Sequence, residues 1–542
     1  MTSKFIQLRS KRLFTTLALL LIASQVIANP PGKHIDPRGA HGRLIIAGGG
    51  VLPTEVYEQF HNWAGGDNAQ LVIIPTASIR SDDPDQVKEI VTAWQLRGFK
   101  EVTVLHTRDR EISDDRKFIA PLLDATAVWI IGGDQSKLSK AYANTKVEEE
   151  LIELLKRGGV IGGSSAGAAI QSKVMIAMGQ LVPRISTGFD LLPGTIIDQH
   201  FSQRNRLARL TFAVNRFDDL VGLGIDESTA LAVDQRFMKV IGNGNVTVCL
   251  GRTRHQSTET KLYADGEFID LTSMRRHARD RSSRPFPAER VQGVSVNKGS
   301  LVIVGGGGMP RPVLDKFIEL AGGPEAKIVV LPTSMPDPIS SDYGKKMFES
   351  VGATNVIVLR DRNKQDVEKE SFLTHLKEAD AIWFGGGRQW RFVDAYEHTK
   401  ALPLMHDVLS RGGVIGGSSA GASIQAEFMV RGNPLGNQDP MAAGYTRGFG
   451  FIKGCGIDQH FAQRGRFTDM SAVVDKHPQL LGIGIDEATA LIVQGDVGEV
   501  LGNGSVHFYD RQKPLTDGDK DYVSISSGKS FHLIEREAIE QE

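Results

Sequence analysis

Two short stretches of the sequence place a serine at the centre of a Gly-x-Ser-x-Gly motif. Ser165 lies within Gly163–Gly167, and Ser419 lies within Gly417–Gly421. An apolar run precedes each motif and an Ala-containing segment follows it, which is typical of a sharp turn from a strand into a helix. Such a turn exposes the serine hydroxyl for nucleophilic attack. Because the motif alone is also typical of an anion-binding Gly/Ser turn, the chemistry depends on what else accompanies the serine.

A serine nucleophile needs a general base, and the base needs a carboxylate that orients it. The sequence offers His200 and His460 as bases, each within an Asp-Gln-His-Phe segment. Glu227 and Glu487 follow the two histidines at the same separation and would complete two Ser–His–Glu sets. The acidic residue directly before each Glu is a rival for the third role, so the sequence leaves this choice open between Glu227 and Glu487 on one side and Asp226 and Asp486 on the other.

The backbone around each serine could also stabilise negative charge. The N–H group of the residue after the nucleophile points at a developing oxyanion, and a Gly-rich strand end can supply a second N–H group. The candidates for this role are Ala166 and Gly133 for the first motif, and Ala420 and Gly387 for the second.

The two motifs belong to a duplication that covers most of the chain. Gly42–Gly50 recurs in similar form as Gly299–Gly307, and Arg157–Ala168 recurs without a change as Arg411–Ala422. Further matched blocks follow in the same order, so chance cannot account for them. We therefore predict two copies of one domain, copy one at 41–272 and copy two at 299–542. An Arg- and Pro-containing solvated linker at 273–298 would join them.

Within each copy, short apolar runs alternate with amphipathic stretches. In the first copy the predicted strands are Leu44–Ala47, Leu71–Ile74, Val102–Leu105 and Ala127–Ile131. The predicted helices are Glu55–Trp63, Asp85–Leu96 and Thr145–Lys156. Strands that are apolar throughout and alternate with helices predict an α/β fold, with a mostly parallel sheet covered on both faces. Ligands of such sheets gather at the carboxyl ends of the strands, where the Gly-rich segments lie.

Residues 1–28 combine basic residues, a short apolar run and a small-residue cleavage site, which is typical of a secretory signal peptide. We therefore expect export to the periplasm or the extracellular medium, and no stable membrane association after cleavage. The net charge of −1 is unlike that of a nucleic-acid binder, so we expect no nucleic-acid partner. The two cysteines, Cys249 and Cys455, cannot form a disulfide framework; the sequence leaves a bond between the copies open and favours two free buried thiols.

Taken together, these motifs resemble the cyanophycinase family of dipeptidase E-type serine peptidases. The resemblance covers nearly all of each copy and rests on Ser165 in Gly-Ser-Ser-Ala-Gly-Ala, on Asp198-Gln-His-Phe-x-x-Arg204-x-Arg206-x-x-Arg209 and on Gly-Ile-Asp-Glu227. It implies a flavodoxin-like fold similar to class I glutamine amidotransferases, with Ser, His and Glu as nucleophile, base and orienting acid. It also implies exopeptidase cleavage of cyanophycin, a poly-aspartate with arginine on its side chains, to β-Asp-Arg dipeptides through an acyl-enzyme. The family needs no metal and no organic cofactor.

The resemblance further implies a set of substrate-binding residues. These are Gln135, Asp198, Gln199, Arg204, Arg206 and Arg209 in copy one, and Gln389, Asp458, Gln459, Arg464 and Arg466 in copy two. Arginine suits bidentate recognition of carboxylates, and Asp198 could receive a guanidinium of the substrate. For each arginine, an internal ion pair is the alternative that the sequence leaves open.

Copy two departs from copy one at two charged positions. Asp469 stands where copy one has Arg209, and Arg388 stands where copy one has Asp134. Copy two also carries an insertion near Gly432–Tyr445. Because a reversed charge in a binding cleft repels the group that was once attracted, we expect most cyanophycin turnover to come from copy one. We also expect the two copies to pair as an intramolecular pseudo-dimer.

Two other functions are compatible with the same motifs. A related exopeptidase for Asp-containing or isoaspartyl dipeptides would share the Ser–His–Glu set and differ in the arginine-binding pocket. A binding protein that keeps the fold without turnover is disfavoured, because Ser, His and Glu are present in both copies.

Overall fold

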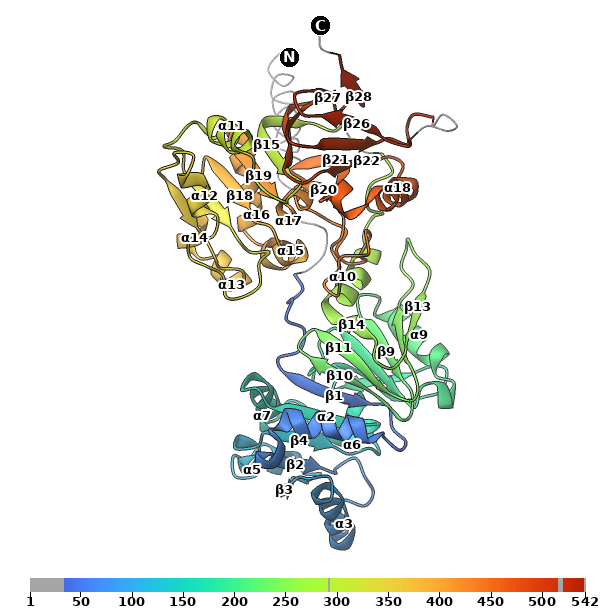
Figure 1. Cartoon of the computed structure of the whole chain (residues 1–542). Coiled ribbons are helices and arrows are strands. Elements are labelled where there is room, and N and C mark those ends of the chain that lie inside the picture. Colours follow the sequence, from blue (N-terminus) through green and yellow to red (C-terminus); the bar gives the residue numbers. More distant parts are fainter. Residues whose placement is uncertain (1–33, 291–292, 515–519, 541–542) are drawn as a thin grey trace, which may run out of the picture. The chain divides into compact units, whose positions relative to one another are not determined.

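The computed structural model of the chain describes residues 34–290, 293–514 and 520–540, so the predicted signal peptide at 1–28 lies outside the described residues. The chain divides into two compact units, with the boundary between Pro285 and Phe286. Each unit carries one copy of the repeated sequence (Figure 1). Within the described ranges, no helix is both long enough and apolar enough to cross a membrane.

The first copy is built on an eight-stranded mixed sheet. Its parallel half has the order β3–β2–β4–β5–β1, and β10, β11 and β14 continue it in antiparallel pairing. The bounds are β1 Arg43–Ala47, β2 Gln70–Ile74, β3 Glu101–Val104, β4 Ala127–Ile130, β5 Val160–Ser164, β10 Thr229–Asp234, β11 Phe237–Gly242 and β14 Phe268–Asp270. The parallel strands of flavodoxin-like folds have the order 2-1-3-4-5. When the strands are counted from β2, β3–β2–β4–β5 take the first four places of this order, and β1 takes the fifth.

A second, smaller sheet holds the strand that precedes His200. Its order is β13–β12–β9–β8, with bounds β8 Thr195–Gln199, β9 Val221–Ile225, β12 Val246–Leu250 and β13 Glu259–Tyr263. A separate hairpin joins β6 Val174–Met178 to β7 Arg184–Thr187. Because β8 and β9 are parallel, the residues that follow them, His200 and Asp226, emerge at the same edge of the sheet.

Helices cover both faces of the large sheet. On one face, α2 and α3 bury Phe60 and Trp94 against Trp129 of β4. On the other face, α6 and α7 contribute Tyr142 and Leu151 to the second core. The helix bounds are α2 Thr54–Ala64, α3 Pro84–Gln95, α4 Arg110–Ser113, α5 Ala120–Leu123, α6 Gln135–Tyr142, α7 Lys146–Lys156, α8 Ala166–Ala169 and α9 Leu207–Arg216. Burial on both faces explains why Leu44–Ala47, Leu71–Ile74 and β4 are apolar throughout, as predicted. The edge strand β3 departs from this prediction, because its Glu101 and Thr103 are exposed.

The second copy repeats this architecture. Its large sheet has the order β17–β16–β18–β19–β15–β23–β24–β27–β28, and its smaller sheet has the order β20–β21–β22–β25–β26. The strand bounds are β15 Val296–Val304, β16 Ile328–Leu331, β17 Val356–Val358, β18 Ala381–Phe384, β19 Val414–Ser418, β20 Ala426–Met429, β21 Ile452–Gln459, β22 Leu481–Ile485, β23 Thr489–Gly495, β24 Val497–Gly502, β25 Ser505–Tyr509, β26 Val523–Ser526, β27 Ser530–His532 and β28 Glu537–Ile539. The helix bounds are α11 Arg311–Ala321, α12 Lys345–Glu349, α13 Lys364–Val367, α14 Glu370–Lys377, α15 Trp390–Tyr396, α16 Ala401–Ser410, α17 Ala420–Ser423 and α18 Phe467–Lys476. Both cysteines, Cys249 and Cys455, are buried and free, as predicted.

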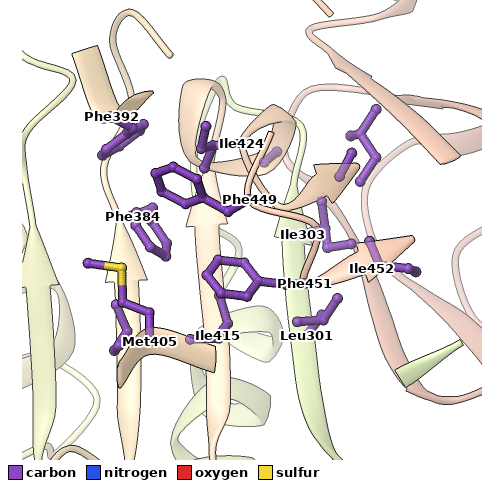
Figure 2. Packing of buried hydrophobic residues seen from close by; sticks show 14 of the residues in the cluster. Leu301, Ile303, Phe384, Phe392, Met405, Ile415, Ile424, Phe449, Phe451 and Ile452 are labelled. Carbon is purple, nitrogen blue, oxygen red and sulfur yellow. The ribbon is translucent and has the colours of Figure 1, made fainter. Parts of the chain in front are cut away.

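Figure 2 shows the apolar core on one face of the second large sheet. Phe384 of β18 and Ile415 of β19 face two aromatic residues from the segment before β21, Phe449 and Phe451. The rings of Phe384 and Phe449 lie 5.9 Å apart between centroids, in an edge-to-face arrangement. This packing supports β18 up to its last residue, Phe384, after which the Gly-rich turn begins.

The Arg-rich segment at 273–298 differs from the predicted solvated linker. Helix α10, Leu271–Arg281, occupies its first part and buries several of its arginines. Arg281, for example, donates to the carboxylate of Glu259 at 2.7 Å. Strand β15 of the second copy already begins at Val296, so the first copy extends beyond 272 to Pro285. The positive charge of α10 serves the packing of the first copy, which a count of charges along the sequence could not reveal.

Candidate active site

Ser165 lies on a strained turn between β5 and α8. Its backbone angles are φ 53° and ψ −109°, and those of Ser419 are φ 57° and ψ −112°. Residues other than glycine seldom adopt such angles, and those that do cluster at functional sites. The glycines of the motif are required by close approach, because a Cβ on Gly163 would lie 2.2 Å from the carbonyl oxygen of Gly167. The nucleophile turn predicted from the sequence is therefore present in both copies.

Ser, His and Glu meet in both copies at hydrogen-bonding distance. In copy one, Nε2 of His200 lies 2.8 Å from Oγ of Ser165, and its Nδ1 lies 2.6 Å from Oε1 of Glu227. In copy two, the corresponding distances among Ser419, His460 and Glu487 are 2.9 Å and 2.6 Å. This is the geometry in which a histidine removes the serine proton while a carboxylate holds its other nitrogen as a donor.

The geometry also decides between the two neighbouring carboxylates. Asp226 accepts the backbone N–H groups of Ser202 at 2.9 Å and Asn245 at 3.0 Å, so it fixes two loops and does not contact the histidine. Asp486 has the same role in copy two, where His507 also contacts it at 3.2 Å. The structure therefore places the glutamate of each Asp-Glu pair in the triad.

Two further residues of copy one position the triad, and the motif analysis missed both. Gly49 lies under the His200 ring, where an added Cβ would come within 2.3 Å of Cε1. Gln203 accepts the backbone N–H of Glu227 at 2.9 Å. Gly306 and Gln463 repeat these contacts in copy two. Their recurrence at matched positions of the duplication was the signal that could have found them.

The electrostatics of the site keep the histidine neutral. Burial lowers the pKa of His200 below its ordinary value of 6.5, and the nearby charges of Arg204 and Arg206 lower it further. The hydrogen bond and the charge of Glu227 act in the opposite direction but do not outweigh these effects. The pKa of His460 is lowered by the same causes. A neutral imidazole is the form that can accept the serine proton.

This balance predicts a pH profile for copy one. In a Ser419→Ala background, kcat/KM should fall only as the pH drops through the lowered pKa of His200, below 6.5. Arg204→Gln removes a positive charge that lowers this pKa. The acid limb of the profile should therefore move to higher pH in that variant. A limb that stays in place would show that Arg204 does not act on His200.

The backbone candidates for the oxyanion lie beside the serine. Ala166 is the first residue of α8, where a helix leaves its N–H groups without intrahelical acceptors. Gly133 follows Gly132, and an added Cβ on Gly132 would lie 3.2 Å from Cβ of Ser165. Ala420 and Gly387 occupy the matching places in copy two. No cluster of three or more potential metal ligands occurs among the described residues.

The residues predicted to bind substrate fall into buried and exposed groups. The side chain of Asp198 is fully buried and pairs with Arg206 at 3.3 Å and with Arg209, whose Nε donates at 2.9 Å. Arg206 also donates to the side chain of Gln199 at 2.9 Å. For Arg206 and Arg209 the structure therefore shows the internal ion pair that the sequence left open. Arg204, in contrast, is exposed.

Gln135 is buried and holds a neighbouring strand in place. Its amide donates to the carbonyl oxygens of Ile176 and Ala177 on β6 at 2.8 and 3.0 Å. Gln389 of copy two donates in the same way to Val430 at 2.8 Å. Gln135 thus connects the Gly-rich strand end beside the serine with β6 of the hairpin in copy one. Gln389 connects the matching strand end with the segment before the insertion in copy two.

Copy two builds its buried ion pair from a different segment. The side chain of Arg431, just after β20, donates to Asp458 at 2.9 Å and to Asp469 at 2.5 Å. Arg466 completes the cluster at 2.8 Å from Asp458. Arg431 thus replaces the cation that Arg209 supplies in copy one, and it also pairs with Asp469, whose side chain stays 40% exposed. The pairing with Arg431 replaces the charge argument for Asp469, whereas weaker binding of substrate by copy two stays a prediction.

Comparison with known proteins also indicates a peptidase, in agreement with the Ser–His–Glu geometry. The model of peptidase family S51 matches residues 44–241 and again 301–501. A cyanophycinase of Geminocystis herdmanii is 33% identical over 247 residues, which cover 43% of this chain and 89% of that protein. A cyanophycinase of Synechococcus elongatus is 33% identical over 233 residues, covering 41% of this chain and 72% of that protein.

Solved structures were compared as well. The crystal structure of a peptidase from an acI-B1 Actinobacterium shares 24% identity and covers 44% of this chain and 98% of that chain, with a TM-score of 0.36. A putative peptidase E protein from Listeria monocytogenes shares 19% identity and covers 38% of this chain and 98% of that chain, with a TM-score of 0.28.

A nucleophilic serine on a strand-to-helix turn, paired with His and Glu on an α/β sheet, defines a serine-type peptidase. The chain belongs to peptidase family S51, which it contains twice in tandem. The resemblance to cyanophycinases that the motifs indicated is confirmed by the relatives.

Proposed function

We propose that this protein hydrolyses cyanophycin to β-Asp-Arg dipeptides as an exopeptidase. The observation that carries the proposal is the pair of assembled Ser–His–Glu triads, in a chain whose relatives are cyanophycinases. The exposed Arg204 beside the base supports it, because a guanidinium can bind a free carboxylate at the end of a poly-aspartate chain. The internal pairing of Asp198 makes this carboxylate an organiser of the site instead of a direct contact to the substrate.

The reaction would proceed through an acyl-enzyme. His200 accepts the proton of Ser165 as Oγ attacks the scissile carbonyl, and Glu227 stabilises the imidazolium that forms. The N–H groups of Ala166 and Gly133 bind the oxyanion. The imidazolium then protonates the leaving amine, and a water molecule activated by His200 hydrolyses the ester. Ser419, His460 and Glu487 perform the same steps in copy two.

Export and domain pairing are part of this proposal. The composition of residues 1–28 supports export to the periplasm or the extracellular medium. The duplication supports an intramolecular pseudo-dimer, since one chain supplies both members of the pair. Fractionation of expressing cells tests the first point, and small-angle scattering in solution tests the second.

Incubation of the purified chain with cyanophycin tests the activity directly. Mass spectrometry of the soluble products should find β-Asp-Arg as the main species at the first time points, because an exopeptidase releases end units. Longer fragments at early times would contradict exopeptidase action. Cleavage of isoaspartyl dipeptides with cyanophycin left intact would replace the proposed substrate by the related dipeptide class.

A further inference from the structure

The residue after the oxyanion glycine carries opposite charges in the two copies. Asp134 follows Gly133, whereas Arg388 follows Gly387. Asp134 is exposed and caps α6, because its carboxylate accepts the N–H of Ser136 at 2.8 Å. In copy two the cap is lost, and the charge beside the Gly-rich strand end is positive.

Arg388 is half-buried and has no acidic partner among the described residues. Its Nη2 donates to two backbone carbonyls of the insertion, those of Asn433 at 2.5 Å and Gly436 at 2.7 Å. Its Nε is buried and finds no acceptor within the described ranges. Burial lowers the pKa of Arg388, and no nearby carboxylate offsets this effect. A desolvated cation without a counter-charge is costly, so this guanidinium is suited to an anion that arrives with a ligand.

The position of Arg388 links it to the reacting atoms. An added Cβ on Gly386 would lie 3.5 Å from Cβ of Ser419, and Arg388 follows two positions later on the same strand end. Its backbone N–H donates to the carbonyl oxygen of Ser334 at 3.0 Å, which fixes the direction of the chain there. The guanidinium is thus held between the strand end beside the nucleophile and the insertion.

The insertion has a second anchor at Arg431. Nη1 of Arg431 donates to the carbonyl oxygens of Asn437 at 3.0 Å and Gln438 at 3.3 Å. The same arginine pairs with Asp458, two residues before the base. The insertion is therefore attached both to the strand end after β18 and to the segment that carries His460. Copy one has only the short β6–β7 hairpin at this place.

We propose that Arg388 determines the specificity of copy two by binding a free carboxylate of the substrate next to the scissile bond. Asp134 disfavours substrates with this carboxylate in copy one. The proposal rests on the proposed peptidase function. Nη1 of Arg388 is left for a carboxylate, because Nη2 already donates to two carbonyls and Nε is buried, and a like-charged residue at the same place repels a carboxylate. Copy two is then suited to short Asp-containing peptides with a free C-terminus. Exopeptidase cleavage of a poly-aspartate chain by copy one releases peptides of this class.

The test uses the full chain with Ser165→Ala, in which Ser419 is the remaining triad nucleophile. The probes are β-Asp-Arg and its C-terminal amide, which differ only in the carboxylate of the arginine residue; the α-carboxylate of Asp is present in both. We expect a preference for the free acid in kcat/KM. Adding Arg388→Gln should lower kcat/KM for the acid by roughly 10- to 100-fold, the range for a lost hydrogen bond to a charged group, and change the value for the amide by less than about 3-fold.

Two matched variants control for collapse of the insertion. Arg388→Lys keeps the charge but loses the planar fork, so it should keep part of the preference for the acid. Asp134→Asn in the Ser419→Ala chain keeps the helix cap, because an amide oxygen also accepts an N–H group, and should improve hydrolysis of the acid by copy one. A serine-reactive covalent probe that still labels Ser419 shows that the Arg388→Gln site is assembled.

Several results would overturn the proposal. Equal losses on acid and amide in Arg388→Gln, with Ser419 still reactive, would assign Arg388 to structure alone. An unchanged preference would do the same. If the Ser165→Ala chain cleaves neither dipeptide, copy two does not act on this class. The proposed function fails separately, only if the Ser419→Ala chain also leaves cyanophycin intact.

Discussion

Replacing both nucleophiles, by Ser165→Ala together with Ser419→Ala, should abolish hydrolysis of cyanophycin. Each serine is the atom that would form the acyl-enzyme, and triad nucleophiles contribute about a thousand- to a million-fold to turnover in other serine peptidases. The fold should survive, because each change removes one hydrogen bond to a histidine, which stabilises a folded protein by about 1 kcal/mol. Rates with cyanophycin and thermal melting of the same preparation measure both quantities.

The single variants serve as the control for this experiment. Ser165→Ala and Ser419→Ala should each retain the activity of the other copy, because each triad is complete within its own unit. A double variant that hydrolyses cyanophycin at the original rate would exclude the serine mechanism. If the double variant unfolds, the single variants test the serine mechanism instead. The loss of cyanophycin hydrolysis in Ser165→Ala and the loss in Ser419→Ala must then add up to the whole activity.

The second large effect concerns the carboxylate that contacts the base. Glu227→Gln, in a Ser419→Ala background, should lower kcat by about a hundred- to ten-thousand-fold, because the imidazolium loses its counter-charge and the amide can stabilise the wrong tautomer. KM should change little, since the glutamate contacts the histidine and not the proposed substrate. Steady-state kinetics at a pH well above 6.5 measures the loss with His200 neutral.

Asp226→Asn in the same background is the matched comparison. Asp226 accepts two backbone N–H groups, so an amide there leaves one of them facing another donor. The expected result is a loss of stability of about 1–3 kcal/mol, with most of the catalytic rate preserved. If Asp226→Asn lowers kcat more than Glu227→Gln, the triad has been assigned to the wrong carboxylate.

Sequence patterns were sufficient for the catalytic centre because each of its requirements is local. The turn at Ser165 needs small neighbours, and the buried parallel strands need apolar residues on both faces. Both requirements can be recognised from the residue types within a few positions of the residue concerned. The duplication then showed the same serine, histidine and glutamate twice. The choice between Asp226 and Glu227 was not accessible in this way, because adjacent residues of equal charge differ only in the direction of their side chains.

The features that sequence reasoning missed all depend on contacts between distant segments. The arginines of α10 resemble a solvated run until the helix packs on the first copy. Arg431 shares no block with Arg209, yet both neutralise the equivalent buried aspartate. Gly49 entered the sequence analysis only within the repeated block Gly42–Gly50, although the His200 ring lies directly over it. Pairings of this kind come from the three-dimensional fold and leave no periodicity in the sequence.

The exchange of the buried cation between Arg209 and Arg431 limits how the two copies can recombine. A chimera that joins the β6 segment of copy one to the α18 segment of copy two would carry Ala177 with Asp469, and its aspartates would lose a cation. The reciprocal chimera would bring Arg431 and Arg209 to one aspartate. We expect crossover points that separate β20 from α18 to unbalance the buried charges and lower stability, whereas exchanges that carry the whole span together keep each charge set intact. The two copies thus hold equivalent buried aspartates with cations from different segments, so the segment after β20 and helix α18 form one unit of exchange.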